Sequence, residues 1–267
     1  MEGRSDSRPI VVKIGGSTLG NHDTTLEDLV ALQKQGYKIA VVHGGGSVVS
    51  DWMKRQGAVP RFVRGLRVTD AMSLEIATAV LTGLINKQMV ASLLSRGAKA
   101  MGLSGVDGAM LECQIANAEL GFVGEITKVN PEHIQSAMKD GYMPIISPIG
   151  IHSNDGSQHA SCLLNINGDT AAGHLARAIK ASHLIFLTDV PAVLDGAGRP
   201  VSRLSIRGAQ MFLRSGIARG GMIPKLEACL EALPTVPAAD IIDGRQQGAL
   251  KASFQKDFTG TRIYAKD

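Results

Sequence analysis

Apolar and polar residues follow two alternating patterns along most of the chain. Almost wholly apolar runs, such as PIVVKIGG at 9–16 and YKIAVVH at 37–43, predict strands buried on both faces. Amphipathic segments follow each run, at 24–36 and 47–57, and predict helices. This succession of strand and helix predicts a mostly parallel sheet with helices on both faces.

The longest helical pattern covers residues 70–96. Its apolar residues spread beyond one narrow stripe, so we expect this helix to contact more than its own sheet. Two interpretations stay open: a central core helix, or a helix that also forms a homodimer interface.

The rest of the chain continues the same rhythm with two hairpins inserted, at 109–129 and 194–204. Further strands are predicted at 98–105, 142–151, 183–190 and 239–244, with an edge strand at 260–264 and a hairpin turn at Asp155-Gly156. Further helices are predicted at 130–141, 168–181, 225–234 and 246–254. We interpret the chain as two lobes that share one sheet and divide near residue 168.

Composition narrows the function classes. The 267 residues are 44% hydrophobic and 19% charged, as in ordinary globular proteins. Aromatic residues make up only 4%, which argues against a base-stacking platform, and the net charge of +4 is not clustered into a basic run. Small anionic ligands suit this mild excess better than a nucleic acid does.

The cysteines, Cys113, Cys162 and Cys229, have neither metal nor redox spacing, and no HExxH motif occurs. Three buried free thiols in a reducing cytosol are the simplest interpretation. The N-terminus lacks an apolar signal core, and no apolar run approaches the ~20 residues of a membrane span. We therefore expect a cytoplasmic protein.

Two glycine loops, KIGGS at 13–17 and HGGGS at 43–47, stand where a strand passes into a helix. Bare backbone there lets N–H groups point at an anion, and the helix dipole adds to the attraction. The loops of adjacent units meet at the carboxyl ends of parallel strands. Together with Lys13 they predict an anion site, although glycines also permit tight turns for purely structural reasons. No Walker loop or protein-kinase motif is present, and the dinucleotide fingerprint fails at Val49.

Three further segments carry candidate chemistry. In NINGDTAAG, Asn165 and Asp169 precede or begin a helix and look into the same cleft, although Asp169 also suits a helix N-cap. In ARGGMIPK, Lys225 lies in a first helical turn, where it opposes the macrodipole, so a phosphate explains it better than structure does. In GLRVTD, Arg67 lies in a loop and suits a carboxylate clamp, although an exposed arginine is usually only solvated.

Together, KIGG, VVHGGG, GLRVTD, GFVGEITKVNPE, NINGDTAAG, LTDVP and GGMIPK resemble the amino-acid kinase superfamily and, within it, the N-acetylglutamate kinases, over Val11 to Ile263. The resemblance implies a three-layer αβα sandwich around a mostly parallel open sheet of about eight strands. An N-terminal lobe, 1–168, would bind the acid and form a homodimer, and a C-terminal lobe, 169–267, would bind ATP. The short segment before the first strand indicates a homodimer that arginine does not inhibit.

The implied reaction is the transfer of a phosphoryl group from ATP to the side-chain carboxylate of N-acetyl-L-glutamate, the second step of arginine synthesis. By resemblance, Lys13 and Lys225 contact the transferring group and Asp169 orients the two lysines. Backbone N–H groups of Gly16 and Gly45 would also bind that group.

The acid would be held by Gly45, Gly46, Asn165 and Arg67, with Arg67 on its α-carboxylate. The segments implied to bind nucleotide are Asp189, Val190, Pro191, Ala192, Val193 and Leu194, and Ile217, Ala218 and Arg219. Ala192 departs from the glycine that the family often has there, which would tighten the nucleotide loop slightly. Mg²⁺ is expected on ATP oxygens and waters, with no protein ligand.

His43 precedes the glycines, but a carboxylate nucleophile needs no general base, so we expect His43 to be structural. Rival functions are another kinase of this fold, acting on carrier-linked aminoadipate, glutamate, aspartate, carbamate or UMP, and a non-catalytic amino-acid sensor. A nicotinamide dehydrogenase ranks third because its fingerprint fails.

Overall fold

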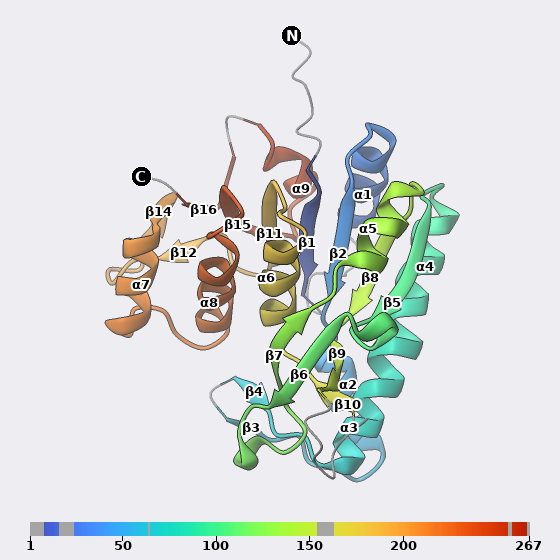
Figure 1. Ribbon diagram of the computed structural model, residues 1–267. Coiled ribbons are helices and arrows are strands. Elements are labelled where there is room, and N and C mark those ends of the chain that lie inside the picture. Colours follow the sequence, from blue (N-terminus) through green and yellow to red (C-terminus); the bar gives the residue numbers. More distant parts are fainter. Residues whose placement is uncertain (1–7, 16–23, 64, 154–162, 256–257, 266–267) are drawn as a thin grey trace.

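The computed structural model describes residues 8–15, 24–63, 65–153, 163–255 and 258–265. An eight-stranded sheet runs through it in the order β14-β16-β15-β11-β1-β2-β8-β5 (Figure 1). Its strands are β1 (Ile10–Ile14), β2 (Ile39–His43), β5 (Ala100–Ser104), β8 (Met143–Ser147), β11 (His183–Thr188), β14 (Arg203–Ser205), β15 (Ala238–Asp243) and β16 (Thr261–Tyr264). Neighbouring strands are parallel except β15 and β16, so the predicted mostly parallel sheet is confirmed.

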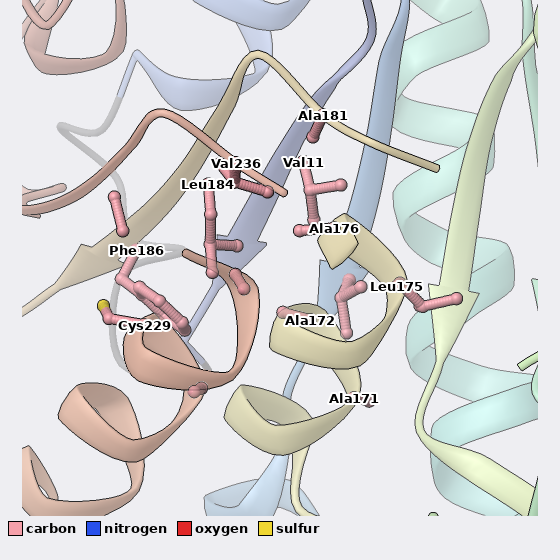
Figure 2. Close-up of a cluster of buried hydrophobic side chains, with 14 of the residues drawn as sticks. Val11, Ala171, Ala172, Leu175, Ala176, Ala181, Leu184, Phe186, Cys229 and Val236 are labelled. Carbon is pink, nitrogen blue, oxygen red and sulfur yellow. The ribbon is translucent and has the colours of Figure 1, made fainter. Parts of the chain in front are cut away.

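Helices cover both faces of this sheet. On one face pack α5 (Glu132–Lys139), α6 (Gly168–Ala178), α7 (Ile206–Arg214) and α8 (Met222–Ala232); on the other pack α1 (Thr25–Lys34), α4 (Asn86–Ser95) and α9 (Ala249–Ala252). Alternate residues of one strand serve the two faces: Val11 joins the first core, and Val12 the second. Figure 2 shows Val11 of β1, Ala172 of α6 and Cys229 of α8 among the side chains of the first core. The predicted three-layer sandwich is confirmed.

The predicted long helix is present, but it is not α-helical throughout. Its three parts are α3 (Ala71–Thr78), a π-helical segment (Ala79–Ile85) and α4. Side chains of the first two parts pack with α2 (Gly46–Arg55) in a third core. By length and composition, Ala71–Ser95 passes the test for a membrane-spanning helix, with a mean hydropathy of 1.3, contrary to our expectation that no segment would. Core helices of soluble proteins pass the same test.

A four-stranded sheet lies below the first, in the order β10-β9-β6-β7 (Figure 1). Its strands are β6 (Leu111–Ile115), β7 (Gly124–Val129), β9 (Ile149–His152) and β10 (Leu163–Asn165), and 3₁₀ turns occupy Asp107–Ala109 and Ala118–Leu120. The predicted hairpin is confirmed as β6 and β7. The single strand predicted at 142–151 is wrong: Pro148 lies between β8, which belongs to the eight-stranded sheet, and β9, which belongs to the four-stranded sheet. The predicted turn at Asp155-Gly156 lies outside the described residues.

Two other details differ from expectation in the C-terminal part. The strand at 260–264, β16, is not at the edge, because β14 pairs with it on the outside. Helix α7 was not predicted, although Ser205 caps it by accepting a hydrogen bond from the N–H of Gly208. The predicted hairpin at 194–204 is confirmed as β12 (Val193–Leu194) and β13 (Pro200–Val201).

Candidate active site

Strands β1 and β2 run parallel and end side by side, so the glycine segments after them meet at one edge of the sheet. The N–H of Gly44 donates to the carbonyl of Ile14 over 2.8 Å, which ties the second loop to the end of the first strand. Lys13 is the fourth residue of β1, and its side chain is 10% exposed. Gly16 lies outside the described residues.

Lys13, Asp169 and Lys225 come together from β1, α6 and α8. The ammonium nitrogen of Lys13 lies 2.6 Å from Oδ1 of Asp169, and that of Lys225 lies 3.1 Å from Oδ2. Lys225 also donates to the carbonyl of Gly221 over 3.1 Å. One carboxylate therefore bridges two cations that are 212 positions apart in the chain (225 − 13).

This cluster carries a surplus positive charge. Asp169 is only 4% exposed, and burial by itself opposes its negative charge. The nearby charges of Lys13 and then Lys225 outweigh burial and hold the pKa of Asp169 below its ordinary value. Two ammonium groups around one carboxylate leave one unit of positive charge, which favours an incoming anion.

The start of α6 frees Asp169 for this role. Asn167, not Asp169, is the N-cap: its Oδ1 accepts from the N–H groups of Asp169 (2.8 Å) and Thr170 (3.1 Å). The alternative that Asp169 caps the helix is therefore wrong. Because Asn167 satisfies the first N–H groups, the Asp169 carboxylate turns to the lysines.

A cavity of about 210 Å³ opens beside the cluster. Its lining includes most of the residues that we predicted for the acid site and for phosphoryl transfer: Lys13, Gly45, Gly46, Arg67, Asn165 and Asp169. Lys225 is not in the lining and reaches the site through Asp169. Basic and amide side chains thus converge on one hollow whose wall also contains apolar groups such as Leu81 and Val123.

Arg67 lies in a short two-stranded ribbon and not in a loop as expected. The ribbon consists of β3 (Phe62–Val63) and β4 (Leu66–Arg67). The Arg67 guanidinium donates to the carbonyl of Gly46 over 2.7 Å and to Oγ of Ser50 over 2.8 Å. It lies 4.7 Å from the centre of the Phe62 ring and is 8% exposed, so its position is well fixed at the cavity wall.

Asn165 ends β10 and supports the same wall. Its amide donates to Oγ1 of Thr69 over 3.1 Å, and Thr69 donates to the carbonyl of Arg67 over 2.9 Å. The side chain of Asn165 is thereby linked to the strand that carries Arg67.

The run of three glycines fits against the long helix. A Cβ atom on Gly45 would overlap Cδ1 of Ile85 and lie 2.9 Å from Cδ2 of Leu81. Both residues belong to the π-helical segment. Gly45 is therefore closely packed against the long helix as well as placed at the cavity, and a Cβ atom there would force the Ile85 and Leu81 side chains to move.

His43 is fully buried and structural, as expected. Its Nδ1 lies 3.0 Å from the carbonyl of Gly44, and its Nε2 lies 3.2 Å from the amide nitrogen of Asn86. Since the Asn86 amide donates, Nε2 accepts and Nδ1 carries the proton. Burial lowers the pKa of His43 to about 4, so the ring is neutral.

The segments expected to bind nucleotide lie on the C-terminal side of the cluster. Asp189, Val190 and Pro191 are exposed after β11, whose end lies beside that of β1. Leu194 and Arg219 are also exposed, and Ile217 is half-buried. The buried residues of the two segments are Ala192, Val193 and Ala218. Val193 and Ala218 both belong to the first core.

Several lining residues were not predicted as site residues. Phe62 and Leu66 reach the cavity from the β3–β4 ribbon, and Asn167 reaches it from the start of α6. A signal for the ribbon exists in the sequence: Phe62 and Val63 lie shortly before Gly65, Leu66 and Val68 follow it, and Gly65 has a φ of +82°. The two strands have only two residues each, too few for alternation to indicate them.

Comparison with known proteins shows the family of the chain. The model of the amino acid kinase family matches residues 8–235. The chain is 44% identical over 254 residues to an acetylglutamate kinase of Dehalococcoides mccartyi, covering 95% of this chain and 93% of that one. It is 43% identical to an acetylglutamate kinase of Methanothrix thermoacetophila, covering 88% and 85%.

A solved structure shows the same fold. The crystal structure of smu.665 from Streptococcus mutans superposes with a TM-score of 0.82 at 26% identity, covering 96% of this chain and 98% of that one. The family model spans well over half of the chain, and the two acetylglutamate kinases match the chain over most of their own length. The chain belongs to the amino acid kinase family, together with the enzymes named acetylglutamate kinase.

Proposed function

We propose that this protein transfers the γ-phosphoryl group of ATP to the side-chain carboxylate of N-acetyl-L-glutamate. The products are ADP and N-acetyl-L-glutamyl 5-phosphate, and the reaction is the second step of arginine biosynthesis. The names of its relatives support the substrate. The observation that carries the chemistry is the placement of Lys13 and Lys225 on one buried carboxylate, beside a cavity that contains Arg67.

The acid occupies the cavity. Arg67 binds its α-carboxylate, because the guanidinium is fixed at the wall and carries a charge that matches a carboxylate. Asn165 and the backbone of Gly45 and Gly46 complete the acid site. The apolar part of the wall, at Leu81 and Val123, suits the uncharged portion of the substrate.

Lys13 and Lys225 stabilise the charge on the phosphoryl group during its transfer from ATP to the acid. Phosphoryl transfer depends almost wholly on position and charge, and both groups are preorganised by Asp169 before any ligand binds. Backbone N–H groups of Gly16 and Gly45 assist them. Asp169 is an organiser, because its two oxygens are already committed to ammonium groups.

No protein base is required. The attacking group is a carboxylate with an ordinary pKa of about 4.3, so it is ionised at neutral pH. His43 lies near the glycines but is buried and bonded on both ring nitrogens. It therefore holds the end of β2 in place and takes no part in proton transfer.

Two segments hold ATP. The first consists of Asp189, Val190, Pro191, Ala192, Val193 and Leu194, and the second of Ile217, Ala218 and Arg219. Among the described residues, no group of three or more His, Cys, Asp or Glu side chains gathers as a metal site. We assign Mg²⁺ to ATP oxygens and water, where it neutralises phosphate charge, because Mg²⁺ keeps much of its hydration shell and uses few protein ligands. The surplus positive charge beside Asp169 fits such a polyphosphate.

The division of labour follows the sequence. The lobe 1–168 binds the acid and the lobe 169–267 binds ATP, with Lys13 contributed by the first and Lys225 by the second. We further propose a homodimer located in the cytoplasm.

A coupled assay of ADP release tests the proposal. The protein is supplied with Mg-ATP and, separately, N-acetyl-L-glutamate, glutamate, aspartate or aminoadipate. We expect release that depends on acetylglutamate and far exceeds release with the other acids. Preference for another acid would assign the protein to a different kinase of this fold, and ATP binding without turnover would favour an amino-acid sensor.

A further inference from the structure

Helices α6 and α8 lie side by side on the sheet (Figures 1 and 2). At one end of their contact, Lys225 of α8 meets Asp169 of α6. Two turns further along, Arg177 of α6 meets Glu231 of α8, with 2.6 Å between Nη1 and Oε1. The Arg177 and Glu231 side chains are 49% and 31% exposed, so their ion pair contributes little to holding the helices together.

Between these two pairs the helix backbones touch at Gly173. A Cβ atom built on Gly173 would lie 2.6 Å from the carbonyl oxygen of Ala228 and 3.0 Å from its Cα and Cβ. Two of these three atoms belong to the backbone, which cannot rotate aside as a side chain can. Glycine destabilises a helix interior relative to alanine, so the helix itself gives no reason for glycine here. The close approach of α8 explains why this position is a glycine.

The contact lies one turn from the catalytic pair on both helices. Gly173 is four residues after Asp169 in α6, and Ala228 is three residues after Lys225 in α8, so each falls on the same helical face as its partner. A displacement of α8 at Ala228 would carry Lys225 with it. Lys13 stands on β1 and would stay in place.

We propose that Gly173 is a positioning residue, whose contact with Ala228 sets the distance from Lys225 to Asp169 and so to the transferred phosphoryl group. The inference rests on the proposed kinase function. It predicts that the size of residue 173 affects turnover through Lys225 and not through Arg67 or Asn165 of the acid site, which belong to β4 and β10.

The first test compares Gly173→Ala with Gly208→Ala. Gly208 is also a helix glycine, but its added Cβ would meet only side-chain atoms, at 3.2 Å from Leu204 and 3.6 Å from Ser205. We expect Gly173→Ala to lower kcat about 10- to 100-fold, as misplacements of about 1 Å do, with the KM for acetylglutamate unchanged. Gly208→Ala should leave both constants unchanged. A kcat for Gly173→Ala equal to that of wild type would overturn the proposal.

A double-mutant cycle then separates positioning from general damage. If Gly173 acts through Lys225, adding Gly173→Ala to Lys225→Ala should cost little or no further kcat. A second loss of the same factor would show that the effect does not pass through Lys225 and would overturn the inference.

The cycle is repeated with Ala228→Ser, which enlarges the other side of the contact, in case Gly173→Ala does not fold. A helical serine can bond to the preceding turn, so this variant is compatible with α8. When it is combined with Lys225→Ala, Ala228→Ser should likewise cause little or no further loss of kcat. A further loss in that background would overturn the inference. Wild-type enzyme without acetylglutamate-dependent ADP release would instead refute the proposed function itself.

Discussion

At the residue scale, the site depends on where charge is buried. An isolated carboxylate as buried as Asp169 would be costly, and two ammonium groups compensate it. Arg67 is buried too, but its partners are a carbonyl and a hydroxyl, so its own charge is not cancelled by these contacts. The pocket thus offers one cationic centre for a carboxylate and another for a phosphoryl group.

This separation predicts a selective effect of Arg67→Ala. Loss of a charged hydrogen-bonding partner is worth about 1.5–3 kcal/mol, so the KM for acetylglutamate should rise roughly 10- to 100-fold while kcat changes little. Steady-state kinetics with acetylglutamate varied at saturating ATP measure the effect. The exposed Arg61 provides the control, as Arg61→Ala should leave KM unaltered. An unaltered KM in Arg67→Ala would remove Arg67 from the acid site.

The site residues differ in how far sequence could identify them. Lys13 and Lys225 stand out because a lysine beside glycines at a strand or helix end has a chemical reason to be there. The choice between Asn167 and Asp169 as helix cap was not determined locally, because both are good acceptors two positions apart. Two lysines from distant parts of the chain, the buried Lys13 and the half-buried Lys225, decide the outcome by attracting the carboxylate of Asp169.

At the element scale, the N-terminus of α6 is the critical support. Asn167→Ala removes the cap and should lower the free energy of unfolding by about 1 kcal/mol, measured by urea denaturation. It should also lower kcat, because Asp169 follows two residues later. Ser205→Ala is the control, because it removes the cap of α7, a helix that carries neither Asp169 nor either site lysine. This variant should lose a similar free energy of unfolding without loss of kcat. Equal kcat in the two variants would contradict this role for the α6 cap.

Elements with strong local patterns were predictable, and those defined by pairing were not. β1, β2 and α6 follow from buried runs and helical periodicity. The division of 142–151 into β8 and β9 depends on Pro148 and on distant partners: β9 pairs with β6, with Glu112 opposite Ile151. The π-helical segment was likewise not predicted, and its Leu81 and Ile85 contact Gly45, which is distant in the sequence.

At the scale of the whole molecule, layers and strand direction followed from sequence because continuous apolar strands must be covered on both sides. The position of β16 inside the sheet did not, since a strand at the chain end looks the same whether or not β14 adds outside it. The lobes, the homodimer and the nucleotide segments stay predictions.

The stability of the molecule should depend on pH through His43. Its pKa is about 4 in the folded protein against an ordinary 6.5, because burial disfavours the charged ring. The unfolded chain therefore binds a proton at His43 more readily than the folded protein does. The contribution of neutral His43 to stability is lost as pH falls from 6.5 towards 4. Between pH 7 and pH 5 the wild type should lose about 2 kcal/mol more than His43→Asn, as determined by urea unfolding. Equal losses would mean that His43 is not the neutral buried group described above.

The most direct test of the two-lysine site is the kcat of Lys13→Ala and of Lys225→Ala with acetylglutamate, followed as ADP release. Each variant loses one preorganised cation, so each kcat should fall at least ~10²–10³-fold while circular dichroism shows an intact fold. Lys139→Ala, which removes an exposed lysine of α5, should match wild type. Near-normal kcat in both site variants would contradict the assignment of Lys13 and Lys225 to phosphoryl transfer.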